Sequence, residues 1–252
     1  MQRHELSAVG AQVNNDTWAD KNEYGHKVAN PGWLLAYGLE SQSKKSELID
    51  RAAFASAPSC VYEAAYRRWS ETVKDESRFA VWEGQLENRL LIGMGASGPL
   101  ETNITLSRPY GMPMIPGSAL KGAARALADA VVDREVRTIV FGQQGHGEEE
   151  FESGYLVFHD AWWIPGSAAH ALTPEVTTPH HPAYYQGKSM EATDFDSPIP
   201  VPQIAAHGAF LFVIEGVAAW AEFGLAILRD ALKDRGIGAA KSAGYGYFIE
   251  RK

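Results

Sequence analysis

The sequence predicts an α+β fold in which a four-stranded antiparallel sheet is backed by two helices and interrupted by long insertions. The main observation is the order of the predicted elements, which is strand, helix, strand, strand, helix, strand. This is the ferredoxin-like βαββαβ order. The second observation is composition, because the predicted strands are rich in aromatic and branched residues and the predicted helices in alanine and leucine.

An N-terminal helix is predicted over residues 61–73, because apolar residues recur there at steps of four and so share one helical face. These residues are Val61, Ala65, Trp69 and Val73. For residues 1–60 the sequence predicts only a partly ordered arm or a short helix. We therefore divide the chain into an N-terminal arm and helix, residues 1–80, and a main domain, residues 81–252.

The main domain holds the six elements of the fold. In chain order they are predicted at residues 85–94, 118–132, 154–163, 209–217, 219–234 and 244–250. The first helix follows Pro116-Gly117, and Ser118 is available to cap it. Insertions are predicted at about 95–116 and 165–207. The second contains seven prolines and exceeds the roughly 12–15 residues usual for an unstructured loop, which indicates a function.

The net charge of −8 is concentrated in one region. Nine of the 31 acidic residues and one of the 23 basic residues lie between positions 143 and 196, so the rest of the chain carries 22 of each. A local basic patch is therefore compatible with the composition, although charge alone fits an ordinary acidic protein equally well. The single Cys60 excludes an intrachain disulfide. The absence of an apolar run of ~18 residues and of a secretory signal predicts a cytoplasmic protein without a membrane contact.

A glycine-rich loop at residues 236–248 joins the second helix to the last strand. Small residues let a backbone approach a phosphate closely, and Lys241 and Ser242 add a charge and a hydroxyl. The loop is not a Walker motif, because Arg235 and Ala240 occupy the required glycine positions and the order of strand and helix is reversed. A helix cap at Gly236 followed by a tight turn and a bulged strand explains the glycines equally well.

Three blocks of sequence resemble one known family. The pattern Gly-Ile-Gly-Ala-x-x-x-x-Gly-Tyr-Gly-Tyr-Phe at 236–248 resembles the signature loop of RAMP proteins, the repeat-associated subunits of CRISPR–Cas effectors. Residues 99–125 look like the first-strand to first-helix region of the same superfamily. Residues 178–202 are similar to the sixth subunits of Cmr complexes, the type III-B effectors. In this chain Lys241 stands one place later than the basic residue of the family pattern.

The resemblance implies a non-catalytic subunit that binds guide RNA (crRNA) near its 3′ portion. It also implies contacts with the repeated RAMP backbone subunits and the small helical subunits, and no cofactor. From the residues themselves, a helix starting at Ser118 offers amides to a phosphate, and Lys121 and Arg125 share one of its faces. Solvated helix charges are the alternative for this pair. The predicted RNA-binding residues are Ser118, Lys121, Arg125, Gly236, Gly238, Lys241, Ser242, Gly244, Tyr245 and Gly246.

Two other function classes are open. An endoribonuclease needs a base and an acid near the 2′-hydroxyl, and the adjacent His180-His181 pair in the proline-rich insertion is the candidate.

A metal site is conceivable but not predicted, because no tight spacing joins its possible ligands and turn chemistry explains the aspartates. Those ligands would be His159, Asp160, His180, His181, Asp194 and Asp196. A protein-only scaffold without RNA contact is the third class.

Overall fold

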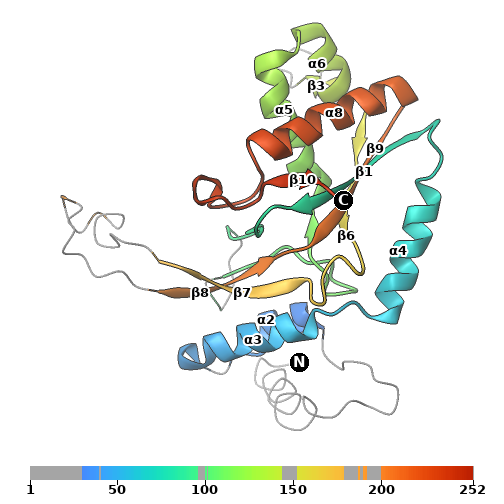
Figure 1. The fold of residues 1–252 in the computed structure, drawn as a ribbon. Helices are drawn as coiled ribbons and strands as arrows, with labels where there is room; N and C mark the ends of the chain where they lie inside the picture. Colours follow the sequence, from blue (N-terminus) through green and yellow to red (C-terminus); the bar gives the residue numbers. More distant parts are fainter. Residues whose placement is uncertain are drawn as a thin grey trace.

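An antiparallel sheet forms the centre of the computed structural model (Figure 1). The structure describes residues 30–39, 41–95, 100, 102–143, 152–178, 187, 190–191 and 200–251. Among these residues the sheet has six strands, which run in the order β10-β1-β9-β6-β2, with β5 also paired to β9. Their bounds are β1 (Phe79–Leu86), β2 (Met114–Ile115), β5 (Val157–Phe158), β6 (Ala161–Trp163), β9 (Ala209–Glu215) and β10 (Phe248–Glu250).

The longest pairing in the sheet joins β1 to β9, from Phe79 opposite Glu215 to Gln85 opposite Ala209. Side chains alternate between the two faces along each strand. On one face Trp82 stacks on Phe212 with ring centroids 4.9 Å apart. Gly84, two residues further along β1, leaves room for these rings, because a Cβ there would lie 2.7 Å from Trp82 and 2.8 Å from Phe212.

Helices α5 (Gly117–Val131) and α8 (Ala218–Asp234) pack against this face (Figure 1). Their buried residues recur at helical spacing, for example Leu120, Ala124 and Ala128 in α5. A further helix, α6 (Arg134–Phe141), follows α5 and leads into the short pair β3 (Gly142–Gln143) and β4 (Glu152–Ser153).

The opposite face of the sheet is partly covered by α4 (Cys60–Thr72). Trp69 and Tyr66 pack there on a smaller core cluster, whose members are Val73, Phe79, Ile164, Ala209, Leu211 and Val213. This helix confirms the predicted N-terminal helix within one residue at each end.

The N-terminal region is more structured than predicted. It contains α2 (Pro31–Tyr37), the 3-10 turn η1 (Gln42–Lys44) and α3 (Lys45–Ala55). Helix α3 packs on a two-stranded ribbon formed by β7 (Leu172–Thr177) and β8 (Val201–Ala206). The ribbon is held at Ser56, whose carbonyl and hydroxyl accept the amides of Ala171 and Leu172 at 3.1 and 2.9 Å.

Several predicted boundaries are wrong for physical reasons. The predicted strand over 85–94 overlaps β1 only at its end, because the buried apolar residues of 90–92 form loop and bridge structure and do not continue the strand. The strand over 154–163 is split into β5 and β6. The sheet exceeds four strands because β2, inside the predicted insertion, pairs with β6. The division at residues 80 and 81 stays a prediction.

The start of α5 is capped by Asp160 and not by Ser118, which is exposed. The Asp160 carboxylate accepts the Gly117 amide at 2.7 Å, and a Cβ on Gly117 would lie 1.9 Å from the Phe158 carbonyl oxygen. The chain therefore needs glycine to bring this helix end so close to β5. None of the helices in the described part of the chain has the length and apolar character that a bilayer crossing requires.

Candidate RNA-binding surface

The glycine-rich loop leaves the end of α8 and returns as β10, and its base is fastened to the chain segment after β1. The Ile237 amide donates to the Gly246 carbonyl at 2.9 Å and closes the base of the loop. The Gly246 amide donates to the Arg89 carbonyl and the Ala239 amide to the Leu91 carbonyl, both at 2.8 Å. The loop therefore has a defined conformation.

Two of its glycines are required by close backbone contacts. A Cβ on Gly238 would lie 2.3 Å from the Leu91 carbonyl oxygen, and one on Gly246 would lie 1.8 Å from the Ile237 carbonyl oxygen. Both residues also have positive φ, at 89° and 79°. The glycines at the loop base thus have a structural role, in agreement with the tight-turn interpretation of the sequence.

The tip of the loop is exposed. A short 3-10 turn, η2 (Lys241–Ala243), is preceded by Ala240 in the left-handed conformation with φ 55°. Lys241, Ser242 and Gly244 are exposed at this tip, and Tyr245 is half-buried. The tip therefore presents a cation and a hydroxyl to the solvent, and these two groups suit a phosphate.

A cluster of Arg89, Glu175 and Tyr245 ties the loop to the ribbon. Arg89 forms an ion pair with Glu175 of β7, and Tyr245 is hydrogen bonded to the same carboxylate. Burial raises the pKa of Glu175. Hydrogen bonds from Arg89, the Val176 amide and Tyr245 lower it by more than burial raises it, so the pKa of Glu175 lies below its ordinary value. Burial and the Glu175 charge raise the pKa of Tyr245.

Replacing Glu175 by glutamine is expected to remove part of the acid dependence of stability. The folded-state pKa of Glu175 is depressed, so its contribution is present above the unfolded pKa of about 4.5 and is lost as the pH falls through the folded pKa. Denaturant unfolding at neutral pH and at successively lower pH measures this. The wild type should lose its advantage over Glu175→Gln as the pH falls below about 4.5. An advantage independent of pH would contradict the assignment.

Lys121 and Arg125 lie four residues apart on α5 and are partly exposed. Neither pairs with a carboxylate in the part of the chain that the structure describes. The Arg235 guanidinium, directly before the loop, donates to the Ala126 carbonyl at 2.7 Å. The loop therefore leaves α8 beside the helix that carries these two cations.

The start of α5 at Ser118 is a poor site for a phosphate. The Gly117 amide is bound by Asp160, and the Ala119 amide donates to the Pro116 carbonyl at 2.9 Å. A carboxylate at a helix N-terminus already satisfies the helix dipole and disfavours a second anion. The phosphate contact predicted for Ser118 has no support from this geometry.

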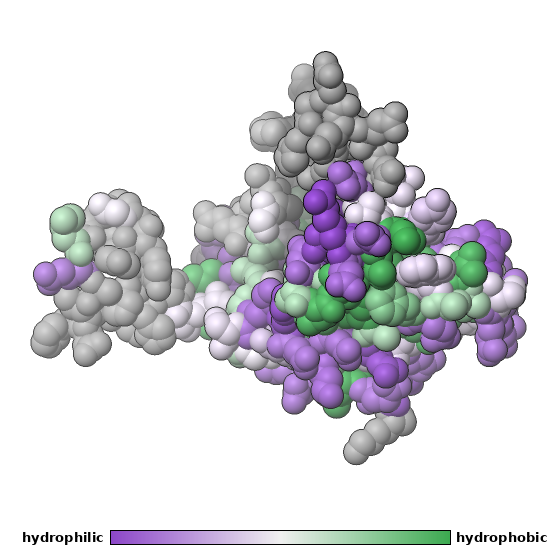
Figure 2. All heavy atoms as spheres, turned by 90° about the horizontal axis from the view of Figure 1, so that it is seen from above, coloured by the Kyte–Doolittle hydropathy of each residue, from purple (hydrophilic) through white to green (hydrophobic). Residues whose placement is uncertain are grey.

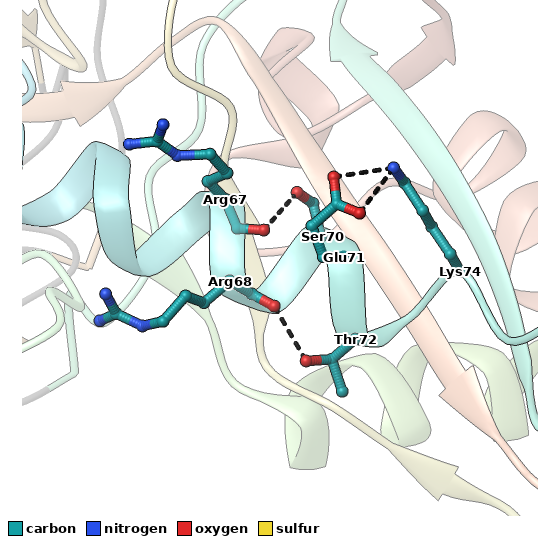
Figure 3. A network of polar contacts seen from close by, with 6 residues as sticks. All are labelled: Arg67, Arg68, Ser70, Glu71, Thr72 and Lys74. Atoms are coloured by element: carbon teal, nitrogen blue, oxygen red, sulfur yellow. Dashed lines mark hydrogen bonds and ion pairs between the residues drawn. The ribbon is translucent and has the colours of Figure 1, made fainter.

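Basic residues of α4 provide a useful contrast. Lys74, just after this helix, is held by both oxygens of Glu71 at 2.7 and 2.8 Å (Figure 3). Arg67 and Arg68 extend from the helix in the same view, and their carbonyls accept the hydroxyls of Ser70 and Thr72. Lys74 is therefore an exposed cation whose charge is already paired.

The candidate nuclease and metal residues are only partly described. His159 Nε2 lies 2.8 Å from one carboxylate oxygen of Glu215. The other oxygen of Glu215 forms an ion pair with Arg78. His180, His181, Asp194 and Asp196 lie outside the described residues. Within the described ranges, no group of three or more acidic, histidine or cysteine side chains is arranged to hold a metal ion.

Comparison with known proteins finds sequence similarity over most of the chain. The family model described as the RAMP superfamily matches residues 85–249. CRISPR system Cmr subunit Cmr6 of Pyrococcus furiosus is 26% identical, over 88% of this chain and 83% of that protein. A human protein, Kelch-like protein 34, is 29% identical over 56% of this chain but only 24% of its own length.

Among solved structures, a chain of the type III-B Cmr-beta complex bound to cognate target RNA superposes with a TM-score of 0.64. It is 20% identical and covers all of this chain and 88% of its own length. At this identity the superposition shows a shared fold.

Proposed function

Because the chain belongs to the RAMP superfamily, we propose that it is the Cmr6-type subunit of a type III-B CRISPR effector complex and binds the guide RNA without cutting it. The observation that carries the proposal is the exposed tip of the glycine-rich loop, with Lys241 at its surface and its base fixed on Arg89 and Leu91. A preformed loop of small residues can follow a sugar-phosphate chain whatever its base sequence.

The core of the chain is proposed to be a ferredoxin-like unit. Strands β10, β1, β9 and β6 lie side by side and antiparallel in this order. Helix α5 lies between β1 and β6 in the sequence, and α8 lies between β9 and β10. This arrangement supports the βαββαβ order, with β2, β5 and the β7–β8 ribbon as additions.

Contacts with other subunits are part of the proposal. Apolar surface is visible among hydrophilic residues on the side of the molecule seen in Figure 2. Exposed apolar residues on the helical layer include Val131, Val217 and Phe223, which are 67%, 72% and 37% exposed. The apolar surface that gathers on the side seen in Figure 2 supports a protein interface. The assignment to the 3′ portion of the guide rests on the third sequence block.

Co-purification tests this function. The chain is expressed with a tag together with the other subunits of its own effector complex and a guide RNA. We expect the tagged chain to recover both the backbone subunits and the guide. If the tagged chain recovers the other subunits but does not crosslink to the guide, the protein-only scaffold without RNA contact is favoured.

The proposed lack of catalysis has a separate test. Purified chain is incubated with end-labelled RNA, with EDTA or with added divalent metal, and the RNA is expected to stay intact in both. Cleavage that disappears on His181→Ala would establish the endoribonuclease class in its place.

A further inference from the structure

A pocket of about 440 Å³ lies between α2 and the extended segment 102–108, away from the glycine-rich loop in the sequence. Its volume falls within the roughly 300–1,000 Å³ of small-ligand sites. The lining residues that the structure describes combine two large rings with amide, hydroxyl and guanidinium groups, and none of them is acidic. In a chain of net charge −8, such a lining favours an anionic ligand.

Two aromatic rings form one side of the pocket. Trp33 and Tyr37 are one helical turn apart on α2, with ring centroids 5.4 Å apart and planes inclined by 45°. Their side chains are 61% and 52% exposed. The helix needs neither ring for its own packing, because Pro31 and Leu34 provide its buried contacts. The exposed parts of both rings are therefore accessible to a planar ligand.

The opposite rim is held in place before any ligand binds. Asn30 accepts the Gly32 amide at 2.8 Å and donates to the Arg108 carbonyl at 3.1 Å, so it joins the start of α2 to the rim. The Gly111 amide closes the turn on the Ser107 carbonyl at 2.7 Å. Gly111 has φ 66°, and a Cβ there would lie 2.5 Å from Asn30 Oδ1.

Arg108 stands at this rim with an exposed side chain. In the described residues it has no carboxylate partner, whereas Arg51, Arg78 and Arg89 each pair with a glutamate. In this arrangement the two rings provide a surface for a base, and the guanidinium provides a counter-charge for its phosphate. A protein side chain could cover the rings, but an apolar one would leave the guanidinium without an anion.

We propose that this pocket binds one unpaired nucleobase of RNA against Trp33 and Tyr37, with the adjoining phosphate on Arg108. The inference rests on the proposed function, in that the chain binds RNA. It adds a second contact point for the strand, built by α2 and the turn 107–111 and separate from the glycine-rich loop.

Fluorescence anisotropy with a labelled single-stranded oligoadenylate, and with a duplex RNA of equal length, tests the pocket on the full chain at low salt. Trp33→Ala is expected to lower the single-strand affinity by about 5- to 150-fold, the equivalent of ~1–3 kcal/mol per stacked base. Trp33→Phe should retain most of the affinity, and duplex affinity should be unchanged. Tyr155→Ala is the matched control, since this ring is 77% exposed elsewhere on the surface.

The outcomes separate the two proposals. If Lys241→Ala weakens RNA binding and Trp33→Ala does not, the pocket inference is wrong and the proposed function stands. If Trp33→Ala abolishes recovery of a partner subunit but leaves RNA affinity unchanged, the pocket is a protein contact and the inference is again wrong. A wild-type chain that binds no RNA at low salt would overturn both.

Discussion

Replacing Gly246 by alanine is expected to lower the free energy of unfolding by about 3 kcal/mol and to abolish the fixed conformation of the glycine-rich loop. The added Cβ would lie 1.8 Å from the Ile237 carbonyl oxygen, which is backbone and cannot rotate away. The residue also has φ 79°, which alanine tolerates poorly. The substitution should therefore break the hydrogen bond that joins the Gly246 amide to the Arg89 carbonyl.

The matched control is Gly244→Ala in the same loop. Gly244 has a similar φ of 86°, but a Cβ there would have no heavy atom within 4 Å. It should cost only the conformational strain, about 1–2 kcal/mol. Denaturant unfolding compares the two variants, and RNA affinity is measured under conditions in which both are folded. Equal losses in stability would show that the carbonyl contact has no influence, contrary to this account of the loop base.

The triple variant Lys121→Ala/Arg125→Ala/Lys241→Ala is expected to lower the affinity for single-stranded RNA by roughly 100-fold, if each charge contributes on the order of 1 kcal/mol. Each lost phosphate contact also reduces the salt dependence. The slope of log affinity against log salt should become shallower by about 2 when three contacts to a single strand are removed. Filter binding at several salt concentrations measures both quantities.

Lys74→Ala is the control for this variant. It removes one lysine that Glu71 already neutralises, on the far side of the sheet from α5 and α8 (Figures 1 and 3). The affinity and slope should stay at wild-type values. An equal loss for Lys74→Ala would mean that net charge, and not the arrangement of α5 and the loop, determines binding. An unchanged triple variant would favour the protein scaffold.

The sequence predicted the long helices and the strand β9 best. The apolar periodicity of the helices and the continuous apolar run of β9 are local patterns that can be recognised without knowing which distant residues pack on them. It failed at β1, where the apolar run at 90–92 was more conspicuous than the alternating Phe79–Leu86. It also missed the β7–β8 ribbon. Pro174 and Pro202 argue against strands, but each strand of a two-stranded ribbon has a free edge, where a missing amide is tolerated.

The candidate site could be predicted only as a loop. Its glycines are visible in the sequence, but the residues that fasten it are far apart in the chain. Arg89, Glu175 and Tyr245 meet only because the ribbon returns beside the end of β1. Likewise, Trp33 and Arg108 line one pocket although α3, α4 and β1 all lie between them in the sequence. No spacing rule links such residues, and the roles of the predicted RNA-binding residues stay predictions.

The buried apolar cluster runs without interruption from Leu48 and Ile49 of α3, through Leu172 and Ile204 of the ribbon, to the central strands. An excised fragment limited to the family-matched span would leave the underside of the ribbon without its apolar cover. The helices before β1 and the sheet should therefore unfold in one cooperative transition.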